Sequence, residues 1–206
     1  MQEDVIIVFV KSPVRGNVKT RIAKTLGDEE ALRIYNYLLD YTLKMCKESE
    51  MMCYIYFDEK PWLVEERFKS ENFMYRLQRG KNLGEKMFQA FFHIAKDFKR
   101  AVIIGSDCPF ITPQIIYKSF AALNSTPLSI GPSTDGGYYL LGIDLTKVTF
   151  MRLSNLFRNI EWSSETVLND TLDRAKEYNL EVTFLPEFYD IDTQSDWENY
   201  EAQKNK

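Results

Sequence analysis

Short apolar runs alternate with longer amphipathic segments along the chain, and this alternation constrains the fold more than any other feature. The apolar runs are rich in β-branched and aromatic residues, which is typical of buried strands. They cover residues 5–10, 51–57, 73–78, 101–105, 127–131, 138–143 and 182–185. Strands of this kind, separated by helices, predict a mainly parallel sheet that is covered on both faces.

The segments between the strands show the apolar spacing of helices that bury one face. We expect helices near residues 28–47, 61–70, 82–98, 113–123, 164–178 and 195–203. Asp28 has the residue type of an N-cap for the first of these. The chain has no internal repeat, low-complexity segment or linker. We therefore predict a single α/β domain over residues 1–206, built as a three-layer α/β/α sandwich.

The composition is that of an ordinary globular domain and excludes several classes of partner. Hydrophobic residues make up 45% of the 206 residues, charged residues make up 27%, and the formal net charge is -4. A broad nucleic-acid interface needs a large basic face, so an acidic chain argues against one. No apolar run reaches the roughly 20 residues that span a bilayer, and we expect no transmembrane segment. The sequence leaves the oligomeric state open.

Glu3 and Asp4 stand where a signal peptide would carry basic residues, which favours a cytoplasmic protein. Cys46, Cys53 and Cys108 are odd in number and lack the spacing of a metal site, so we expect free thiols in a reducing compartment.

A basic segment follows the first predicted strand. Residues 11–24 contain five cations and no acidic residue. A proline- and glycine-containing turn with this charge favours an anion, and phosphate is the usual candidate. A solvated surface loop is the alternative. The P-loop motif is not met, because Val18 stands where that motif requires glycine. The residues expected to bind phosphate are Lys11, Pro13, Gly16, Lys19, Thr20 and Arg21.

Acidic residues follow other strands, and ligands of open α/β sheets bind at the carboxyl ends of strands. Asp107 follows the strand at 101–105, and Asp192 follows the last strand after a short loop. If the sheet brings them together, this pair would suit Mg²⁺ or Mn²⁺, which take one or two carboxylates plus phosphate oxygens. Asp107 has an alternative role as a helix cap. Asp190 has alternative roles as a metal ligand or a turn residue.

Two further segments are candidates for substrate contact. Asp135-Gly136-Gly137 reads as a turn, in which the glycines let the backbone approach a ligand and Asp135 binds a hydroxyl or the metal. A tight connection between strands is the alternative. Trp162 is expected either to stack on a base or sugar or to pack in the core.

Six segments in this order resemble a bacterial and archaeal GT-A-like glycosyltransferase family of the nucleotide-diphospho-sugar transferase superfamily. The resemblance covers residues 5 to 197. The segments are K-S-P-x-x-G-x-x-K-T-R at 11–21, Q-R-G-K-N-L-G-E-K-M at 78–87, G-S-D-C-P at 105–109, G-P-x-x-D-G-G-Y-Y-L-L-G at 131–142, W-S-S-E-T-V at 162–167 and D-I-D-T at 190–193.

The resemblance implies a Rossmann-like GT-A fold in which the first loop holds the nucleotide. It also implies that Asp107 binds the metal and that Asp192 completes the metal site. One departure is that Ser106-Asp107-Cys108 carries a single carboxylate where GT-A glycosyltransferases commonly have a D-x-D pair. The K-T-R loop also resembles that of molybdenum-cofactor and phospholactate nucleotidyltransferases.

The leading hypothesis is therefore metal-dependent transfer of a sugar from a nucleotide-diphospho-sugar to a small-molecule acceptor. Asp107 and Asp135 are the candidate catalytic residues, and Gly136, Gly137 and Trp162 are the candidate substrate contacts. The first alternative is nucleotidyl transfer from a nucleoside triphosphate to a phosphorylated acceptor. The second is a non-catalytic nucleotide-binding domain.

Overall fold

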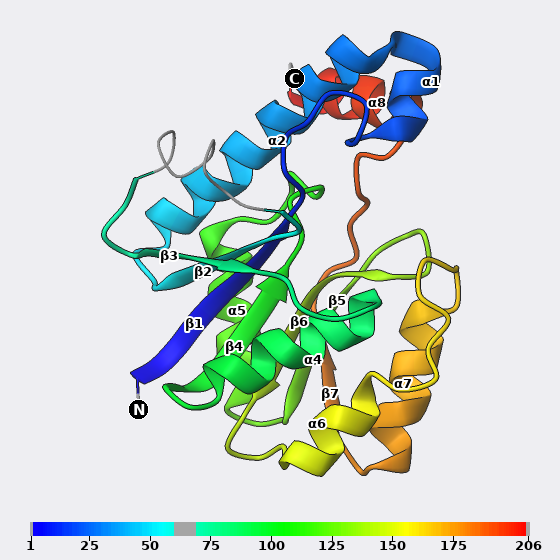
Figure 1. Ribbon diagram of the computed structural model, residues 1–206. Coiled ribbons are helices and arrows are strands. Elements are labelled where there is room, and N and C mark those ends of the chain that lie inside the picture. Colours follow the sequence, from blue (N-terminus) through cyan, green and yellow to red (C-terminus); the bar gives the residue numbers. More distant parts are fainter. Residues whose placement is uncertain (1, 60–68, 205–206) are drawn as a thin grey trace.

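One mixed sheet forms the centre of the molecule (Figure 1). The computed structural model describes residues 2–59 and 69–204. Within them, seven strands pair in the order β3-β2-β1-β4-β6-β5-β7. Only β6 runs antiparallel to its neighbours, so the predicted single α/β domain with a mainly parallel sheet is confirmed. The strands are β1 Gln2–Val10, β2 Cys53–Phe57, β3 Phe73–Leu77, β4 Phe98–Ile104, β5 Leu128–Pro132, β6 Tyr138–Asp144 and β7 Val182–Phe184.

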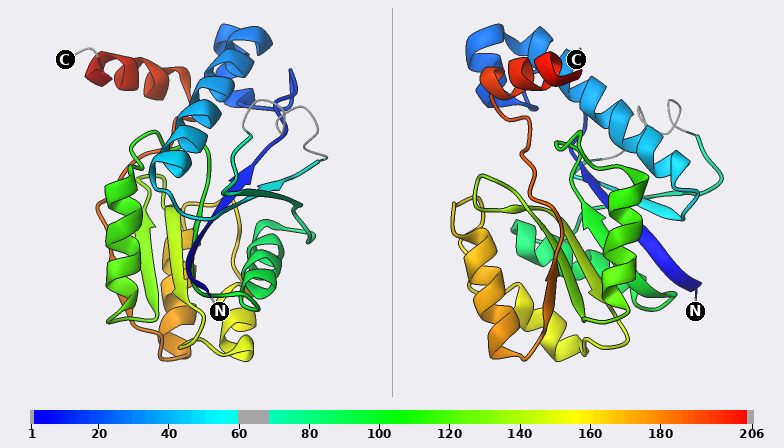
Figure 2. Two further views of the ribbon diagram at one scale, coloured as in Figure 1. Left: turned by 90° about the vertical axis from the view of Figure 1, so that its left-hand side faces the viewer. Right: turned by 180° about the vertical axis from the view of Figure 1, so that it is seen from behind.

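Helices cover both faces of this sheet, as the left view of Figure 2 shows. Helices α2 and α5 contribute to the core on one face, and α4, α6 and α7 contribute to the core on the other. Helices α1 and α8 pack with α2 in a third apolar cluster beyond the carboxyl end of β1 (Figure 1). The described helices are α1 Thr20–Leu26, α2 Asp28–Glu48, α4 Leu83–Ile94, α5 Pro113–Leu123, α6 Phe150–Leu156, α7 Val167–Glu177 and α8 Gln194–Lys204.

Strand β1, in the interior of the sheet, shows why the sheet needs two covered faces. Ile6 and Val8 belong to the core beneath α2 and α5, whereas Val5 and Ile7 belong to the core beneath α4, α6 and α7. Successive strand residues point to opposite faces, so an unbroken apolar run buries both of them. All four side chains are fully buried.

The structure corrects several predicted boundaries. The helix predicted at 82–98 ends at Ile94, because Phe98 pairs with Gln2 as the first residue of β4. Helices α1 and α6 were not predicted, since seven residues show too little periodicity to be recognised. Gly27, not Asp28, is the N-cap of α2. Most of the helix predicted at 61–70 lies outside the described residues.

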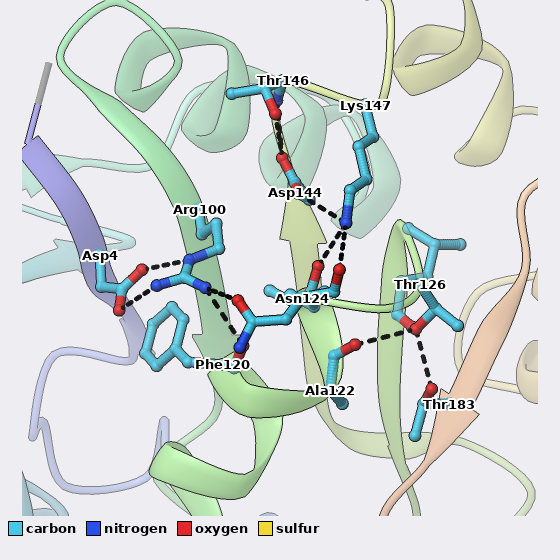
Figure 3. Close-up of polar contacts among 12 residues, drawn as sticks. Asp4, Arg100, Phe120, Ala122, Asn124, Thr126, Asp144, Thr146, Lys147 and Thr183 are labelled. Atoms are coloured by element: carbon cyan, nitrogen blue, oxygen red, sulfur yellow. Dashed lines mark hydrogen bonds and ion pairs between the residues drawn. The ribbon is translucent and has the colours of Figure 1, made fainter.

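A polar network joins the ends of the strands opposite the carboxyl ends of β1 and β4 (Figure 3). Arg100 on β4 donates to the two carboxylate oxygens of Asp4 on β1 at 2.6 and 2.9 Å, and to Asn124 Oδ1 at 2.6 Å. Lys147 donates to the main-chain oxygens of Leu123 and Asn124 at 2.6 and 3.0 Å, where α5 ends. These cations satisfy a carboxylate and the last carbonyls of a helix, which is a structural role.

No helix in the described part of the chain is both long and apolar enough to cross a membrane. Cys46, Cys53 and Cys108 are buried free thiols.

Gly142 on β6 supplies a test of the packing between α5 and the sheet. A Cβ at this position would lie 2.2 Å from Ser129 Oγ and 2.8 Å from Ser119 Oγ. These buried hydroxyls share a 2.7 Å hydrogen bond. Overpacking a filled core destabilises it, so we expect Gly142→Ala to lower the free energy of unfolding by about 2 kcal/mol in urea denaturation. Gly105→Ala is the control, because its Cβ meets nothing within 4 Å; equal losses in both variants would contradict the packing argument.

Candidate functional site

Three residues that the sequence places far apart meet beyond the carboxyl ends of β1 and β4. The ammonium nitrogen of Lys19 lies 2.9 Å from Asp107 Oδ1 and 3.2 Å from Asp192 Oδ1. The Lys19 side chain is only 4% exposed. The structure therefore brings together the two carboxylates predicted for a metal and one cation predicted for phosphate.

Hydrogen bonds of the main chain fix the positions of Asp107 and Asp192 relative to each other. The N–H of Ile191 donates to the main-chain oxygen of Asp107 at 2.9 Å, which ties the segment before α8 to the end of β4. The Asp196 carboxylate accepts hydrogen bonds from the N–H groups of Asp192 and Thr193 at 3.1 and 2.7 Å. Thr193 Oγ in turn accepts the Asp196 N–H at 3.3 Å, so the start of α8 is capped and the main chain of Asp192 is tied to the cap.

The basic segment is anchored by residues that sequence reasoning did not assign to the site. The Tyr35 hydroxyl accepts from the Lys11 N–H at 2.9 Å and donates to the Lys11 main-chain oxygen at 2.7 Å. Asp58 accepts the Ser12 N–H at 2.7 Å. The Gln78 amide donates to main-chain oxygens at the ends of β1 and β2, at 3.1 and 3.0 Å. Of these three residues, only Gln78 belongs to a motif that the sequence analysis recognised, as the first residue of the segment at 78–87.

The backbone of the basic segment needs two unusual conformations. Gly16 has φ 81°, and a Cβ there would meet only Asp28 Oδ2, at 3.9 Å, so glycine serves the backbone angle and not a close contact. Lys19 has φ 47°, in the left-handed region that non-glycine residues rarely occupy. The ion pairs of its side chain offset the cost of that conformation.

The other predicted phosphate ligands surround Lys19 less closely. Arg21, on α1, has a guanidinium nitrogen 3.6 Å from Asp192 Oδ2 and is 71% exposed. Lys11 and Thr20 are exposed, and Pro13 is half-buried in the turn. Phosphate binding by these residues stays a prediction.

Burial and charge act in opposite directions on Lys19. Burial alone would lower the pKa of the Lys19 ammonium, but Asp107 and Asp192 raise it by more, so the net shift is upward and the side chain is charged.

The Asp190 carboxyl shows the opposite balance between burial and charge. Burial, followed by repulsion from Asp107, raises the pKa of the Asp190 carboxyl to about 7.

The carboxylates fit a divalent cation that also contacts a substrate. Asp107 Oδ1 is buried and accepts no well-aligned hydrogen bond from the described residues, so its 2.9 Å contact with Lys19 is an ion pair only. Within residues 2–59 and 69–204, no three acidic, histidine or cysteine side chains are arranged to hold a metal. A cation held by Asp107 and Asp192 would therefore need substrate oxygens to complete its shell, as Mg²⁺ usually does. It would also displace the Lys19 ammonium from between them.

Asp135-Gly136-Gly137 forms a tight turn before β6. Asp135 Oδ1 accepts the Gly137 N–H at 3.0 Å. Gly136 has φ 87°, and a Cβ there would lie 2.1 Å from the Glu165 carbonyl oxygen. The close approach that requires Gly136 is thus made by residue 165. A substrate role for this turn stays a prediction, in which Asp135 still presents an exposed side chain.

Trp162 lies apart from the Lys19 cluster, in a cavity of about 590 Å³ between α4 and α6. Its indole packs on Gly84, where a Cβ would lie 2.5 Å from the ring. Sequence reasoning did not single out the two arginines of this cavity. The lining residues are Arg79, Gly80, Asn82, Gly84, Glu85, Phe88, Gln89, Ser154, Phe157, Arg158, Asn159, Ile160 and Trp162.

The comparison with solved structures gives the class of fold, which is that of the nucleotide-diphospho-sugar transferases. A proposed nucleotide-diphospho-sugar transferase from Desulfovibrio desulfuricans G20 is 30% identical, with a TM-score of 0.89 over 100% of this chain and 89% of that chain. The 4-diphosphocytidyl-2C-methyl-D-erythritol synthase from Anaerococcus prevotii DSM 20548 is 12% identical, with a TM-score of 0.68. The match covers 100% of this chain and 97% of that chain. Rv0371c from Mycobacterium tuberculosis H37Rv, in complex with manganese, is 13% identical, with a TM-score of 0.56. The match covers 96% of this chain and 97% of that chain.

Residues 42–164 match the family described as "Uncharacterized protein conserved in bacteria (DUF2064)", and the chain belongs to this family. No curated protein is significantly similar to the chain. The resemblance inferred from the six motifs and the GT-A-like fold are thus confirmed. The two neighbours of low identity show the fold alone.

The position of Lys19 predicts how the site responds to metal. Lys19→Met removes the ammonium but keeps an apolar side chain, so the two carboxylates should bind Mn²⁺ at least about tenfold more tightly in the absence of nucleotide. Isothermal titration and electron paramagnetic resonance of free Mn²⁺ measure this. Lys24→Met, on the exposed part of α1, is the matched control. Unchanged Mn²⁺ affinity in Lys19→Met would rule out the proposed exchange.

The raised pKa of Asp190 predicts a pH-dependent stability. Between about pH 4 and pH 7 the folded protein holds a proton that the unfolded chain has released, so this residue's contribution to stability is lost as the pH rises through about 7. Asp190→Asn cannot ionise and should have a higher melting temperature than the parent at about pH 8, with a smaller difference at about pH 5. Melting is measured with a chelator present. Asp173→Asn, exposed on α7, controls for the loss of one charge; a parallel shift at both pH values would contradict the assignment.

Proposed function

We propose that this protein transfers a sugar from a nucleotide-diphospho-sugar to a small-molecule acceptor, with Mg²⁺ or Mn²⁺ bound at Asp107 and Asp192. The observation that carries the proposal is the meeting of Lys19, Asp107 and Asp192 at the carboxyl edge of the sheet. Ligands of open α/β sheets bind at this edge. The description of the 30% identical Desulfovibrio protein supports the class of donor.

Lys19 and Arg21 are the cations closest to the carboxylates, and they would bind the phosphates of the donor. Charge-assisted hydrogen bonds from ammonium and guanidinium groups to phosphate oxygens are among the strong ones in proteins. Lys19 is already charged and ordered, so little side-chain entropy is lost when its ammonium turns from the aspartates to a phosphate. Lys11 would extend the same basic surface.

A divalent cation on Asp107 and Asp192 would neutralise the charge that develops on the departing diphosphate. In the transfer, the bond between the anomeric carbon and the diphosphate oxygen breaks, and the diphosphate leaves with the electron pair. A bond between the anomeric carbon and the acceptor oxygen forms, and the proton of the acceptor hydroxyl passes to water. Asp135, exposed in the turn before β6, would orient the sugar or that hydroxyl.

Nucleotidyl transfer is the second candidate, because the fold is shared with a protein described as a cytidylyltransferase, from Leptospira borgpetersenii. The same cations would then bind a nucleoside triphosphate, and an acceptor phosphate would attack the α-phosphate. Pyrophosphate is the product of that reaction, whereas a nucleoside diphosphate is the product of sugar transfer. The product therefore separates the two functions.

Asp107→Asn tests the proposal. We expect release of nucleoside diphosphate from a panel of nucleotide-diphospho-sugars with Mn²⁺ to fall on the order of 100-fold, because a carboxylate that holds the cation is lost. The melting temperature without ligand measures whether the fold is kept. Asp173→Asn is the control and should retain the parent rate. An unchanged rate in Asp107→Asn would contradict the metal assignment, and pyrophosphate release from a triphosphate would favour nucleotidyl transfer instead.

A further inference from the structure

The cavity between α4 and α6 is distinct from the Lys19 cluster and has no role in the function described so far. Its volume of about 590 Å³ falls within the range of small-molecule sites, roughly 300–1,000 Å³. None of Lys19, Asp107 and Asp192 lines it. Its walls combine cationic and aromatic side chains, and each component indicates a part of the ligand.

Two arginines supply the charge. Arg79 precedes α4, Arg158 follows α6, and both are exposed side chains that line the cavity. Across the described ranges, neither guanidinium has a hydrogen-bond or ion-pair partner. Glu85 also lines the cavity, but one of its oxygens accepts the Lys81 N–H at 2.8 Å. Guanidinium groups without a carboxylate partner are suited to a phosphate or carboxylate.

Aromatic rings supply the apolar wall. Phe157 and Trp162 have ring centroids 6.4 Å apart. Phe88 lines the cavity as well and stacks on Phe92 at 6.0 Å, outside it. Phe92 in turn contacts Phe150 at 5.2 Å, and these two side chains are 41% and 58% exposed. The apolar wall therefore continues from the cavity onto the surface of α4 and α6.

A short loop connects this cavity to the charged centre. Residues 160–166 place Trp162 in the cavity and the Glu165 carbonyl against Gly136. The Leu168 N–H then donates to the Gly136 main-chain oxygen at 2.8 Å. Burial, repulsion from Asp107 and repulsion from Asp135 raise the pKa of Asp190, so the turn that contacts the loop is electrostatically coupled to the charged centre.

We infer that this cavity binds the acceptor, and that the acceptor is a small molecule with an anionic group and an apolar, ring-containing body. Arg79 and Arg158 bind the anionic group, and Phe88, Phe157 and Trp162 pack on the apolar body. The assignment of this ligand as an acceptor rests on the proposed transferase function. The existence and chemistry of the binding site do not depend on it.

The test uses 1-naphthyl phosphate as a probe of the full chain, with no donor or metal present. The indole N–H signal of Trp162, assigned by Trp162→Phe, reports binding in ¹⁵N-resolved spectra. We expect a saturable shift, and we expect 1-naphthol and inorganic phosphate each to bind at least about tenfold more weakly because each lacks one half of the ligand. Equal binding of 1-naphthol would overturn the role of the arginines, and equal binding of inorganic phosphate would overturn the role of the rings.

Variants separate this site from the donor site. Arg79→Ala and Arg158→Ala should each weaken 1-naphthyl phosphate about tenfold, whereas Arg174→Ala, which removes an arginine paired with Glu177 on α7, should not. Both cavity variants should keep the thermal shift given by nucleotide-diphospho-sugars. Loss of that shift, or competition between the probe and the nucleotide, would overturn the inference by making the cavity part of the donor site. Failure of the sugar-transfer assay alone would leave these binding results unchanged and would count only against the proposed reaction.

Discussion

The ammonium group of Lys19 joins two carboxylates that come from different parts of the chain. Asp107 follows the central strand β4, Asp192 precedes α8, and Lys19 precedes α1. An unpaired buried lysine would cost several kcal/mol, and two bare aspartates side by side would repel each other. The contacts at 2.9 and 3.2 Å relieve both problems at once. Any cation or phosphate that enters this centre must replace one of those contacts, so ligand binding and local structure are coupled.

Apolar packing beyond the sheet fixes where this centre forms. Ile191 is fully buried in the cluster that joins α8 to α1 and α2, together with Ile22 and Trp197. Asp190 and Asp192 flank Ile191 in sequence, so burial of one side chain places both carboxylates near Lys19. The final helix thus positions the charged centre although none of its own residues lies between the carboxylates.

Much of the fold follows from local patterns, because unbroken apolar runs and amphipathic helices leave few alternatives. The rule that ligands bind at the carboxyl ends of strands made Asp107 and Asp192 a candidate pair, with Asp190 as an alternative ligand, but it left open whether the sheet brings them together. The pairing of Lys19 with these carboxylates was not predictable, since it depends on a left-handed residue at the start of a seven-residue helix. The need for glycine at position 136 could not be explained from the sequence either, because the group that approaches it is the carbonyl oxygen of Glu165. Contacts between loops carry no periodicity in sequence.

The six sequence motifs divide into two groups once the contacts are known. The segments at 11–21, 105–109 and 190–193 build the charged centre around Lys19. The segments at 78–87, 131–142 and 162–167 contact one another through Gly84 on Trp162 and Gly136 on Glu165, and residues of the first and third line the cavity. Under the proposed function, the first group holds the donor and the second lies beside the proposed acceptor cavity. A transferase must hold a donor and an acceptor at the same time, so the two groups have complementary roles in that proposal.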